Sequence, residues 1–352
     1  MRVLVVNAGS SSLKLSVLDG GEVVAQQHLE RWDGTGGVAE FLADAPDVDA
    51  VGHRVVHGGP DFTGPVLLDD GSRAAIERLT GLAPLHQPRA LAGIDAVTSL
   101  LPDVPQVACF DTSFHHTMPA SATTYAVPAR WRDEWGVRRY GFHGLSHAYA
   151  SRRAAELAPG SRVVTCHLGA GCSLAAVRDG RSVDTTMGFT PLAGLVMATR
   201  SGDVDPGLLV WLLRNEKVSA AELEDDLEHR SGLLGLAGSA DLRDVHRAGT
   251  PEADLAVEVF VHRLCQGIAA MAASLGGLDV LVFTGGVGEH DAEVRARTAQ
   301  GLAFLGVALD ADRNTAREGD EVISTDDSTA AVVVVQARED LEIATLVREA
   351  LT

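Results

Sequence analysis

The sequence predicts an α/β protein made of two similar halves, and three observations carry that prediction. Runs of apolar, β-branched residues alternate with segments of helical periodicity, as in α/β proteins. The chain has 352 residues, which suffices for about two domains of roughly 150 residues each. A segment near the amino terminus also reappears near the middle of the chain. We therefore expect a duplicated two-domain fold with a cleft between the halves.

The internal repeat aligns VLVVNAGSSSLKLSVLDGGEVV, which starts at Val3, with VVTCHLGAGCSLAAVRDGRSVD, which starts at Val163. Each copy is typical of a strand, a small-residue turn, a second strand, an Asp-Gly turn and a third strand. A chance similarity between two hairpins is the alternative interpretation. The repeat predicts a first half over residues 1–113 and a second half over 114–338. At a constant offset the identical pairs are Val3/Val163, Gly9/Gly169, Val17/Val177, Asp19/Asp179, Gly20/Gly180 and Val23/Val183.

The remaining elements follow from periodicity and capping signals. The best-defined helix is Pro251–Leu275, because Thr250 can cap its first turn and apolar residues recur every three or four positions. Further helices are expected at Pro88–Leu101, Leu145–Leu157, Asp291–Leu305 and Arg338–Leu351. Strands are expected at Arg2–Val6, Leu13–Leu18, Val48–Val56, Gln106–Phe110, Arg162–His167, Leu174–Val177, Leu278–Thr284 and Ala330–Gln336.

The composition excludes some partners. With 29 Lys and Arg against 48 Asp and Glu, the formal net charge is −19, which would repel nucleic acid or an anionic membrane. A small anionic substrate needs a site that gathers its own positive charge. The longest nearly apolar stretch, Gly267–Phe283, is interrupted by Ser, Gly and Asp, so we expect no membrane span there. No signal peptide is apparent and the four cysteines lack CxxC spacing, so we expect reduced thiols and a cytoplasmic protein.

Three glycine-rich turns are candidates for binding phosphate. In Asn7–Ser12 the small residues let the backbone come close, and N–H groups and hydroxyls present donors, with Lys14 adding charge. A plain Gly-Ser hairpin turn with an exposed Lys is the alternative. His167–Gly171 offers the same close approach, and Thr284–Glu289 stands between a strand and a helix, as nucleotide-binding loops do. Neither a Walker P-loop nor a GxGxxG fingerprint is present, which disfavours a dinucleotide oxidoreductase.

Charged residues at strand ends are the next candidates. Arg54 lies near the end of one predicted strand and Asp111 directly follows another, where α/β sheets expose catalytic groups. Arg200 lies in a loop of turn formers, and guanidinium forks suit carboxylate and phosphate oxygens, although a surface ion pair is the plainer interpretation. Glu222–Glu228 is expected to be a solvated helix face.

Two histidine pairs have the spacing of a zinc site, but neither favours one. His53 and His57 fall in a strand, where residues four apart are too distant to share an ion. His143 and His147 straddle a predicted helix start, so spacing alone leaves zinc open there. Hydrogen-bond donation by His143 to a phosphoryl group, or capping, is the favoured role.

Long motifs follow one another in order along nearly the whole chain. They are NAGSSSLK (Asn7–Lys14), HRVVHGG (His53–Gly59), LAPLHQP (Leu82–Pro88), FDTSFHHTMP (Phe110–Pro119), RRYGFHGLSH (Arg138–His147), HLGAGCS (His167–Ser173), DTTMGFTPLAG (Asp184–Gly194), TRSGDVDP (Thr199–Pro206), SADLRDV (Ser239–Val245), FTGGVGEH (Phe283–His290) and REDLEIA (Arg338–Ala344). With these motifs the chain resembles the acetate kinase family, the short-chain acyl phosphotransferases of the sugar-kinase/actin superfamily. The resemblance implies a duplicated actin/sugar-kinase-like (ribonuclease H-like) fold. It also implies that the last helix returns to the first half, giving domains 1–113 plus 339–352 and 114–338, the second carrying most of the nucleotide site.

The resemblance implies a role for each matching position. Catalytic roles fall to Asp111, His143 and Arg200, and metal binding to Asn7 and Glu339. Substrate binding falls to Arg54 and an apolar pocket of Val56, Leu85, Phe142 and Pro191. Nucleotide binding falls to Ser10, Ser12, Lys14, His167, Leu168, Gly169, Ala170, Gly171, Asp241, Leu242, Arg243, Gly286, Val287, Gly288, Glu289 and His290. Mg²⁺, with Mn²⁺ as an alternative, ATP and a homodimer are also implied.

The implied reaction is the reversible transfer of the γ-phosphoryl group of ATP to acetate, giving acetyl phosphate and ADP. A carboxylic acid is ionised at neutral pH, so direct in-line attack needs no general base. On this interpretation Asp111 orients Mg²⁺ or its water, and a role as base is the weaker hypothesis. Propionate or butyrate kinase and a non-catalytic actin-like nucleotide switch are the alternatives. Ala170 and Ala198 replace the usual Asn and Gly, so the donor stays open between ATP, another nucleoside triphosphate and pyrophosphate.

Overall fold

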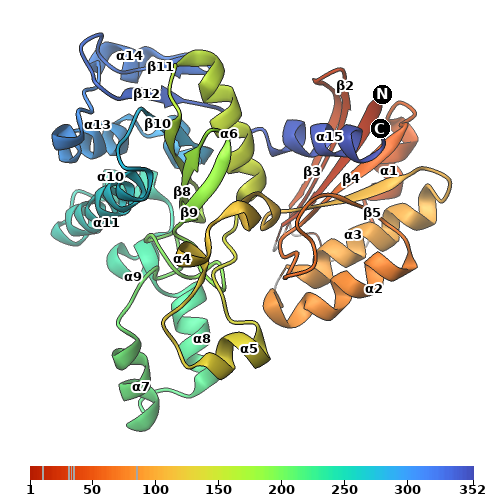
Figure 1. Cartoon of the computed structure of the whole chain (residues 1–352), viewed down its shortest axis with the longest axis horizontal. Helices are drawn as coiled ribbons and strands as arrows, with labels where there is room; N and C mark the ends of the chain where they lie inside the picture. The colour runs from red at the N-terminus through yellow and green to blue at the C-terminus, as the bar shows by residue number, and fades with distance from the viewer. Residues whose placement is uncertain (10–11, 31, 33, 35, 85) are drawn as a thin grey trace. The chain divides into compact units, whose positions relative to one another are not determined.

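The computed structural model describes residues 1–9, 12–30, 32, 34, 36–84 and 86–352 (Figure 1). The chain divides into two compact units. The first unit comprises Met1–His116, Phe142–Tyr149 and Arg338–Thr352, and the second comprises Thr117–Gly141 and Ala150–Ala337. These units differ from the predicted ranges chiefly because Phe142–Tyr149 belongs to the first. The functional domains and the cleft between them stay predictions.

The first unit is a six-stranded sheet with helices on both faces, and its strands run in the order β3-β2-β1-β4-β6-β5. β1, β4 and β6 are parallel, while β2, β3 and β5 pair antiparallel. Its strands are β1 (Arg2–Ala8), β2 (Ser12–Asp19), β3 (Glu22–Glu30), β4 (Ala50–Val55), β5 (Val66–Leu67) and β6 (Gln106–Phe110). Its helices are α1 (Val38–Asp44), α2 (Asp70–Arg78), α3 (Gln87–Leu100) and α15 (Glu339–Ala350), with 3-10 turns at Leu79–Leu82 and Ser113–Thr117.

Alternation along β1 builds two hydrophobic cores, one on each face of this sheet. Leu4 and Val6 pack with Phe41 of α1 and Val97 of α3. Residues of opposite parity face α15, whose buried apolar side chains are Ile343, Ala344 and Val347. Figure 1 shows α15 lying across the sheet opposite α2 and α3. Gly52 in β4 permits this contact, because a Cβ there would overlap Ile343. The close packing sets the first residue of α15, Glu339, against the sheet.

The second unit repeats this architecture with strand order β11-β12-β10-β7-β8-β9. Its strands are β7 (Arg162–Leu168), β8 (Cys172–Arg178), β9 (Arg181–Thr185), β10 (Val280–Thr284), β11 (Glu321–Val322) and β12 (Ala331–Val334). Its helices are α4 (Ala120–Thr123), α5 (Ala129–Trp135), α7 (Pro206–Arg214), α8 (Ala220–His229), α9 (Gly232–Ala237), α10 (Leu242–Ala248), α11 (Pro251–Leu275), α12 (Gly285–His290), α13 (Ala292–Gly301) and α14 (Ala311–Ala316), with a 3-10 turn at Ala303–Leu305. α6 (Gly144–Leu157) runs from the first unit into the second.

The two sheets have the same connectivity. Adding six to each strand number of the first sheet gives the strand order of the second sheet, read from its opposite edge. Parallel and antiparallel pairs correspond throughout. The strand registers correct the constant offset of the predicted repeat. Ala8 pairs with Leu13 across the first turn, whereas Leu168 pairs with Cys172, so the second turn is one residue shorter. The offset inferred from sequence therefore holds for the first strand of each copy and shifts by one beyond the turn.

α11 is the helix that most resembles a membrane span by composition. The helix has 25 residues and contains an 18-residue window with a mean hydropathy of 1.3, so it is long and apolar enough to cross a bilayer, and 39% of that window is buried. The core helix of a globular protein meets the same criteria of length and hydropathy. α11 has the buried stripe of such a core helix, which includes Val257, Leu264 and Ile268. The predicted Thr250 cap is confirmed, because its side chain accepts a hydrogen bond from Ala253 N.

Most predicted elements are confirmed. The differences lie at the ends of helices and strands, and in elements that were not predicted, such as the helices α2 and α7 and the two-residue strands β5 and β11. The helix predicted at Asp291–Leu305 ends at Gly301 and continues as a 3-10 turn, because Gly306 takes a left-handed φ of 78° after it. Thr284–Glu289, predicted as a loop, is mostly the helix α12. Glu222–Glu228 lies in α8, which has no buried residue, as its charge predicts.

Candidate active site

The carboxyl ends of the parallel strands in the first sheet gather four predicted residues. Asn7 is near the end of β1, Arg54 near the end of β4, and Asp111 directly follows β6. Glu339 opens α15 on the adjoining face. Parallel strands bring their carboxyl ends to one edge, and this edge is where α/β sheets place ligands.

An ion pair between Arg54 and Asp111 is the centre of this cluster. Arg54 Nη2 donates to Asp111 Oδ2 at 2.7 Å, and Arg54 Nε lies 3.2 Å from both carboxylate oxygens. The Asp111 side chain is 2% exposed and that of Arg54 is 16% exposed. The pair is therefore buried at its acidic end, while the guanidinium keeps some contact with solvent.

For both Asp111 and Arg54, burial and the charge of the partner group shift the pKa in opposite directions. Burial raises the pKa of the Asp111 carboxyl, with Glu339 adding to the rise, while the adjacent Arg54 guanidinium opposes it. Burial by itself would lower the pKa of Arg54, but the charges of Asp111 and Glu339 outweigh it and raise that pKa. Arg54 is thus a permanent cation, held in one orientation by a carboxylate that is shielded from water.

Asn7 and Glu339, the predicted metal ligands, complete the cluster. Arg54 Nη1 donates to Asn7 Oδ1 at 3.1 Å and lies 3.5 Å from Glu339 Oε2. Asn7 Nδ2 donates to Glu339 Oε2 at 3.1 Å. Across the described ranges no group of three or more His, Cys, Asp or Glu side chains is arranged to hold a metal ion. A magnesium site here would accordingly combine the Asn7 amide oxygen with carboxylates and with oxygens from the substrate.

The start of α6 brings His143 beside Asp111. Gly144 N donates to the Asp111 carbonyl oxygen at 2.9 Å, and His143 takes a left-handed φ of 54° just before the helix. Phe142 is buried and meets the His57 ring edge to face, with centroids 5.4 Å apart. The predicted apolar substrate residue Phe142 and the predicted catalytic His143 therefore follow each other at this edge.

The other predicted residues of the first unit take varied positions. Val56 is buried just past β4, Ser12 opens β2, and Lys14 is exposed opposite Asn7 in the β1–β2 ladder. Ser10 and Leu85 lie outside the described residues. His53 bonds Gln106 Oε1 at 2.7 Å, and burial lowers its pKa to about 4, so it is a neutral structural histidine.

In the second unit, predicted nucleotide residues gather at the corresponding sheet edge. His167 and Leu168 end β7, and the turn that follows closes through Gly169 N donating to Gly171 O at 3.0 Å. Gly285 begins α12 directly after β10, with a φ of 78°. A Cβ on Gly285 would lie 2.7 Å from Leu168 O, so only glycine lets α12 approach this closely.

The Arg200 loop joins the same edge. Ala198 N donates to Ala170 O at 3.1 Å, which ties the loop to the β7–β8 turn. Arg200 Nη1 donates to Pro191 O at 2.7 Å, so these two predicted residues are in contact. Burial lowers the pKa of Arg200, and Glu228, 4.0 Å from its Nε, works against that shift.

α10 carries the last predicted segment, Asp241–Arg243. Asp241 caps the helix by accepting from Arg243 N at 2.9 Å, and the Arg243 side chain holds the pKa of Asp241 at about 2. The sequence analysis missed His246, one turn further along, which lies 2.9 Å from Asp291 Oδ2 at the end of α12. It also missed Gly144, for which the Gly after His143 in HGLSH is the available signal.

The fold and the two sheet edges define a class of protein. One unit presents a fixed guanidinium among carboxylates, and the other presents glycine turns and a short helix at strand ends, which are the parts that phosphoryl transfer needs. Two α/β units of identical connectivity, equipped in this way, are typical of the phosphotransferases of the sugar-kinase/actin fold.

Comparison with known proteins narrows this class. The model of the acetokinase family matches residues 36–345. Acetate kinase of Nostoc punctiforme is 50% identical over 306 residues, covering 85% of this chain and 75% of that protein. The crystal structure of Porphyromonas gingivalis acetate kinase has a TM-score of 0.92 at 38% identity, with 100% of both chains covered. A propionate kinase from Francisella tularensis has a TM-score of 0.89 at 35% identity, covering 99% of both. The chain belongs to the acetokinase family, and it is a phosphotransferase rather than a non-catalytic switch.

Gly144→Ala tests the contact that sets His143 beside Asp111. The new Cβ would overlap the Asp111 carbonyl oxygen and crowd Phe114, so the start of α6 must move. We expect a loss of about 2 kcal/mol in the free energy of unfolding, measured in urea, together with reduced phosphotransferase activity. Gly64→Ala is the matched control, since a Cβ there meets nothing within 4 Å. Equal stability of both variants would contradict the assigned contact.

Proposed function

We propose that the protein catalyses the reversible transfer of the γ-phosphoryl group of ATP to acetate, yielding acetyl phosphate and ADP. Membership of the acetokinase family supports this reaction. The single structural observation that carries the proposal is the Arg54 guanidinium, fixed by Asp111 at the carboxyl edge of the first sheet. A guanidinium held in this way can receive an anionic carboxylate without first having to be ordered.

The proposed chemistry is a direct in-line displacement. A carboxylate oxygen of acetate attacks the γ-phosphorus, the bond from that phosphorus to the β–γ bridging oxygen breaks, and ADP leaves with the electron pair. Acetate is already ionised at neutral pH, so no group has to remove a proton. The bidentate contact with Arg54 engages both oxygens of Asp111, which favours an orienting role for Asp111 over a role as base.

The remaining predicted residues supply charge and donors. Arg200 and His143 would contact phosphoryl oxygens, and the His167–Gly171 turn with α12 and Asp241–Arg243 would bind the nucleotide. These assignments come from the family resemblance and stay predictions. What supports the nucleotide assignments is that His167 and Leu168 end β7, while Gly285 and Leu242 begin α12 and α10, where backbone N–H groups are available to an anion. Arg200 lies in a loop, and its support is the hydrogen bond between Ala198 N and Ala170 O that ties this loop to the β7–β8 turn.

The first-unit cluster fits Mg²⁺ in its chemistry. Carboxylate and amide oxygens are hard ligands, and Mg²⁺ is commonly held by one or two carboxylates plus substrate phosphates. Asn7 and Glu339 would hold it, with Asp111 beside them. Bound Mg²⁺ would neutralise charge on the phosphate oxygens. Mn²⁺, which prefers similar ligands, is the alternative ion.

The acyl substrate is proposed to be acetate, with propionate as the second candidate. Propionate is kept as a candidate because the chain is similar to the structure of a propionate kinase at 35% identity. Val56 and Phe142, both buried near the Arg54 edge, would meet the methyl end of the acid. One methylene changes selectivity by only ~1–3 kcal/mol, so activity with both acids is expected.

A steady-state series tests the reaction and the acyl preference together. We expect kcat/KM to be highest for acetate, within about a hundredfold for propionate, and lower for formate and butyrate. Acyl phosphate is trapped as the hydroxamate, with ATP, GTP and pyrophosphate compared as donors. Activity should vanish with excess chelator and return with Mg²⁺ or Mn²⁺. Absence of acyl phosphate with every short acid would overturn the proposal, and a preference for propionate would reassign the substrate.

We further propose that the protein forms a homodimer through α7, in a cytoplasmic setting. α7 is PGLLVWLLR and has no buried residue, and Trp211 at its centre is 53% exposed. An apolar helix left open on a charged protein marks an interaction surface, and the family resemblance makes a second copy of this chain the expected occupant. The four cysteines are free thiols, which suits a reducing compartment.

Trp211→Glu tests the dimer. Placing a charge in the centre of the apolar helix should shift the protein from dimer to monomer in sedimentation velocity at micromolar concentration. Phe304→Glu is the control, because Phe304 is 74% exposed in a different element and should leave the dimer unchanged. A monomeric parent protein, or a Trp211→Glu dimer of undiminished affinity, would overturn the α7 interface.

A further inference from the structure

Two segments expected to hold the nucleoside, Asp241–Arg243 on α10 and Gly286–His290 on α12, are connected by side chains outside every predicted set. α12 is only six residues long and carries several glycines, so its own hydrogen bonds cannot hold it firmly. Its start is fixed by the close approach of Gly285 to Leu168 O. Its end is held by side chains of α13 and of neighbouring residues.

Arg295 fixes the end of α12 by donating hydrogen bonds to its last carbonyl groups. This residue of α13 is 2% exposed, and its Nη1 donates to Gly288 O and to Glu289 O, each at 2.9 Å. The carbonyl groups in the last turn of a helix receive no hydrogen bond from within that helix, so Arg295 supplies the missing donors here. A buried guanidinium is costly to place, and burial lowers the pKa of Arg295 to about 10, with the Arg317 charge adding to the shift. It nonetheless stays protonated at neutral pH and keeps all its donors.

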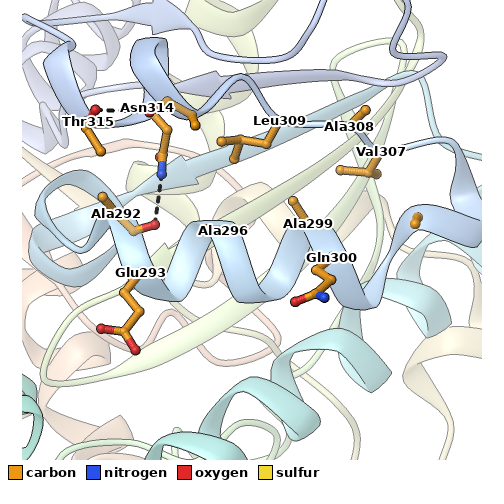
Figure 2. A pocket seen from close by; sticks show the side chains of 12 residues that line it. Ala292, Glu293, Ala296, Ala299, Gln300, Val307, Ala308, Leu309, Asn314 and Thr315 are labelled. Atoms are coloured by element: carbon orange, nitrogen blue, oxygen red, sulfur yellow. Dashed lines mark hydrogen bonds between the residues drawn. The ribbon is translucent and has the colours of Figure 1, made fainter.

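Asn314 fixes the other edge of this guanidinium. Arg295 Nε donates to Asn314 Oδ1 at 2.7 Å, and Nη2 donates to Asn314 O at 2.8 Å. Asn314 in turn donates from Nδ2 to Ala292 O at 2.9 Å, as Figure 2 shows. The amide lies on the wall of a pocket of about 620 Å³, lined mostly by alanines of α13 and by residues 307–309. Four hydrogen bonds therefore hold the guanidinium plane in one position under α12.

His246 connects α10 to the same end of α12. Its Nε2 lies 2.9 Å from Asp291 Oδ2, and its Nδ1 lies 3.5 Å from Glu293 Oε2. Asp291 directly follows α12, donates from its backbone N to Val287 O at 2.9 Å, and caps α13 through Val294 N. One carboxylate thus joins the end of α12, the start of α13 and the middle of α10.

We propose that Arg295 and His246 are positioning residues that set α12 and α10 at the spacing required to bind the nucleoside part of the phosphoryl donor. The inference rests on the proposed function, because it assumes that these helices form the nucleotide site. Neither side chain is assigned to touch the nucleotide. Each acts through the backbone or carboxylate that it holds, so its loss alters nucleotide affinity rather than the chemistry of the acyl group.

The test compares variants of these two residues in the full-length protein. Arg295→Met and His246→Leu remove the hydrogen bonds, while His246→Gln retains a neutral donor toward Asp291. Arg263→Met is the control, because Arg263 is an exposed residue of α11 whose side chain donates to Gln266 Oε1 on the same helix. Melting temperature and circular dichroism establish the folded fraction. The readouts are the Kd for ADP by calorimetry and the KM for ATP and for acetate.

We expect Arg295→Met and His246→Leu to weaken ADP and raise the KM for ATP by about tenfold, the effect of losing roughly one charge-assisted hydrogen bond. The KM for acetate should stay within about twofold, and His246→Gln and Arg263→Met should behave like the parent protein. A merely structural role would lower the active fraction and leave both KM values unchanged, which would overturn the inference. Should Arg295→Met fail to fold, His246→Leu and its Gln partner decide alone. A parent protein that binds no nucleotide would instead refute the proposed function.

Discussion

The buried ion pair between Arg54 and Asp111 is the constraint on which the proposed site depends. It crosses from β4 to β6, and its guanidinium also contacts Asn7 of β1 and approaches Glu339 of α15. A protein with a net charge of −19 would otherwise repel both a carboxylate and a nucleotide. Because the acidic partner is shielded from water, it can hold the cation in place without cancelling it for a ligand that reaches the exposed side.

The duplicated architecture supplies a second sheet edge, which suits the phosphates of the nucleotide. The same strand connectivity that brings Arg54 to one sheet edge brings the β7–β8 turn and α12 to the corresponding edge of the other sheet. The two copies have diverged in what this edge carries. The first copy has charged side chains, whereas the second has glycines whose backbone approaches closely, as Gly285 does to Leu168. A single ancestral architecture thereby provides one unit suited to a small anion and one suited to phosphates.

Sequence patterns predicted the sheets, the long helices and the strand-end positions of Arg54 and Asp111, because these depend on local periodicity and on the rule that parallel strands end together. The ion pair itself was not predicted, since 57 residues separate its partners and only the β4–β6 register brings them into contact. The same reason hid His246 and Arg295, whose partners are set by the packing of α10, α12 and α13. The one-residue difference between the two turns was also hidden, because identical residues aligned at a constant offset while the register did not.

The most direct test of this account is a double-mutant cycle on kcat/KM for acetate, with Arg54→Lys, Asp111→Asn and the combined variant. If Asp111 acts through Arg54, replacing it should cost at least about tenfold more in the parent protein than in the Arg54→Lys background. Equal losses in both backgrounds would show that Asp111 contributes independently of Arg54, as a base or a metal ligand, and would contradict the central role given to the ion pair.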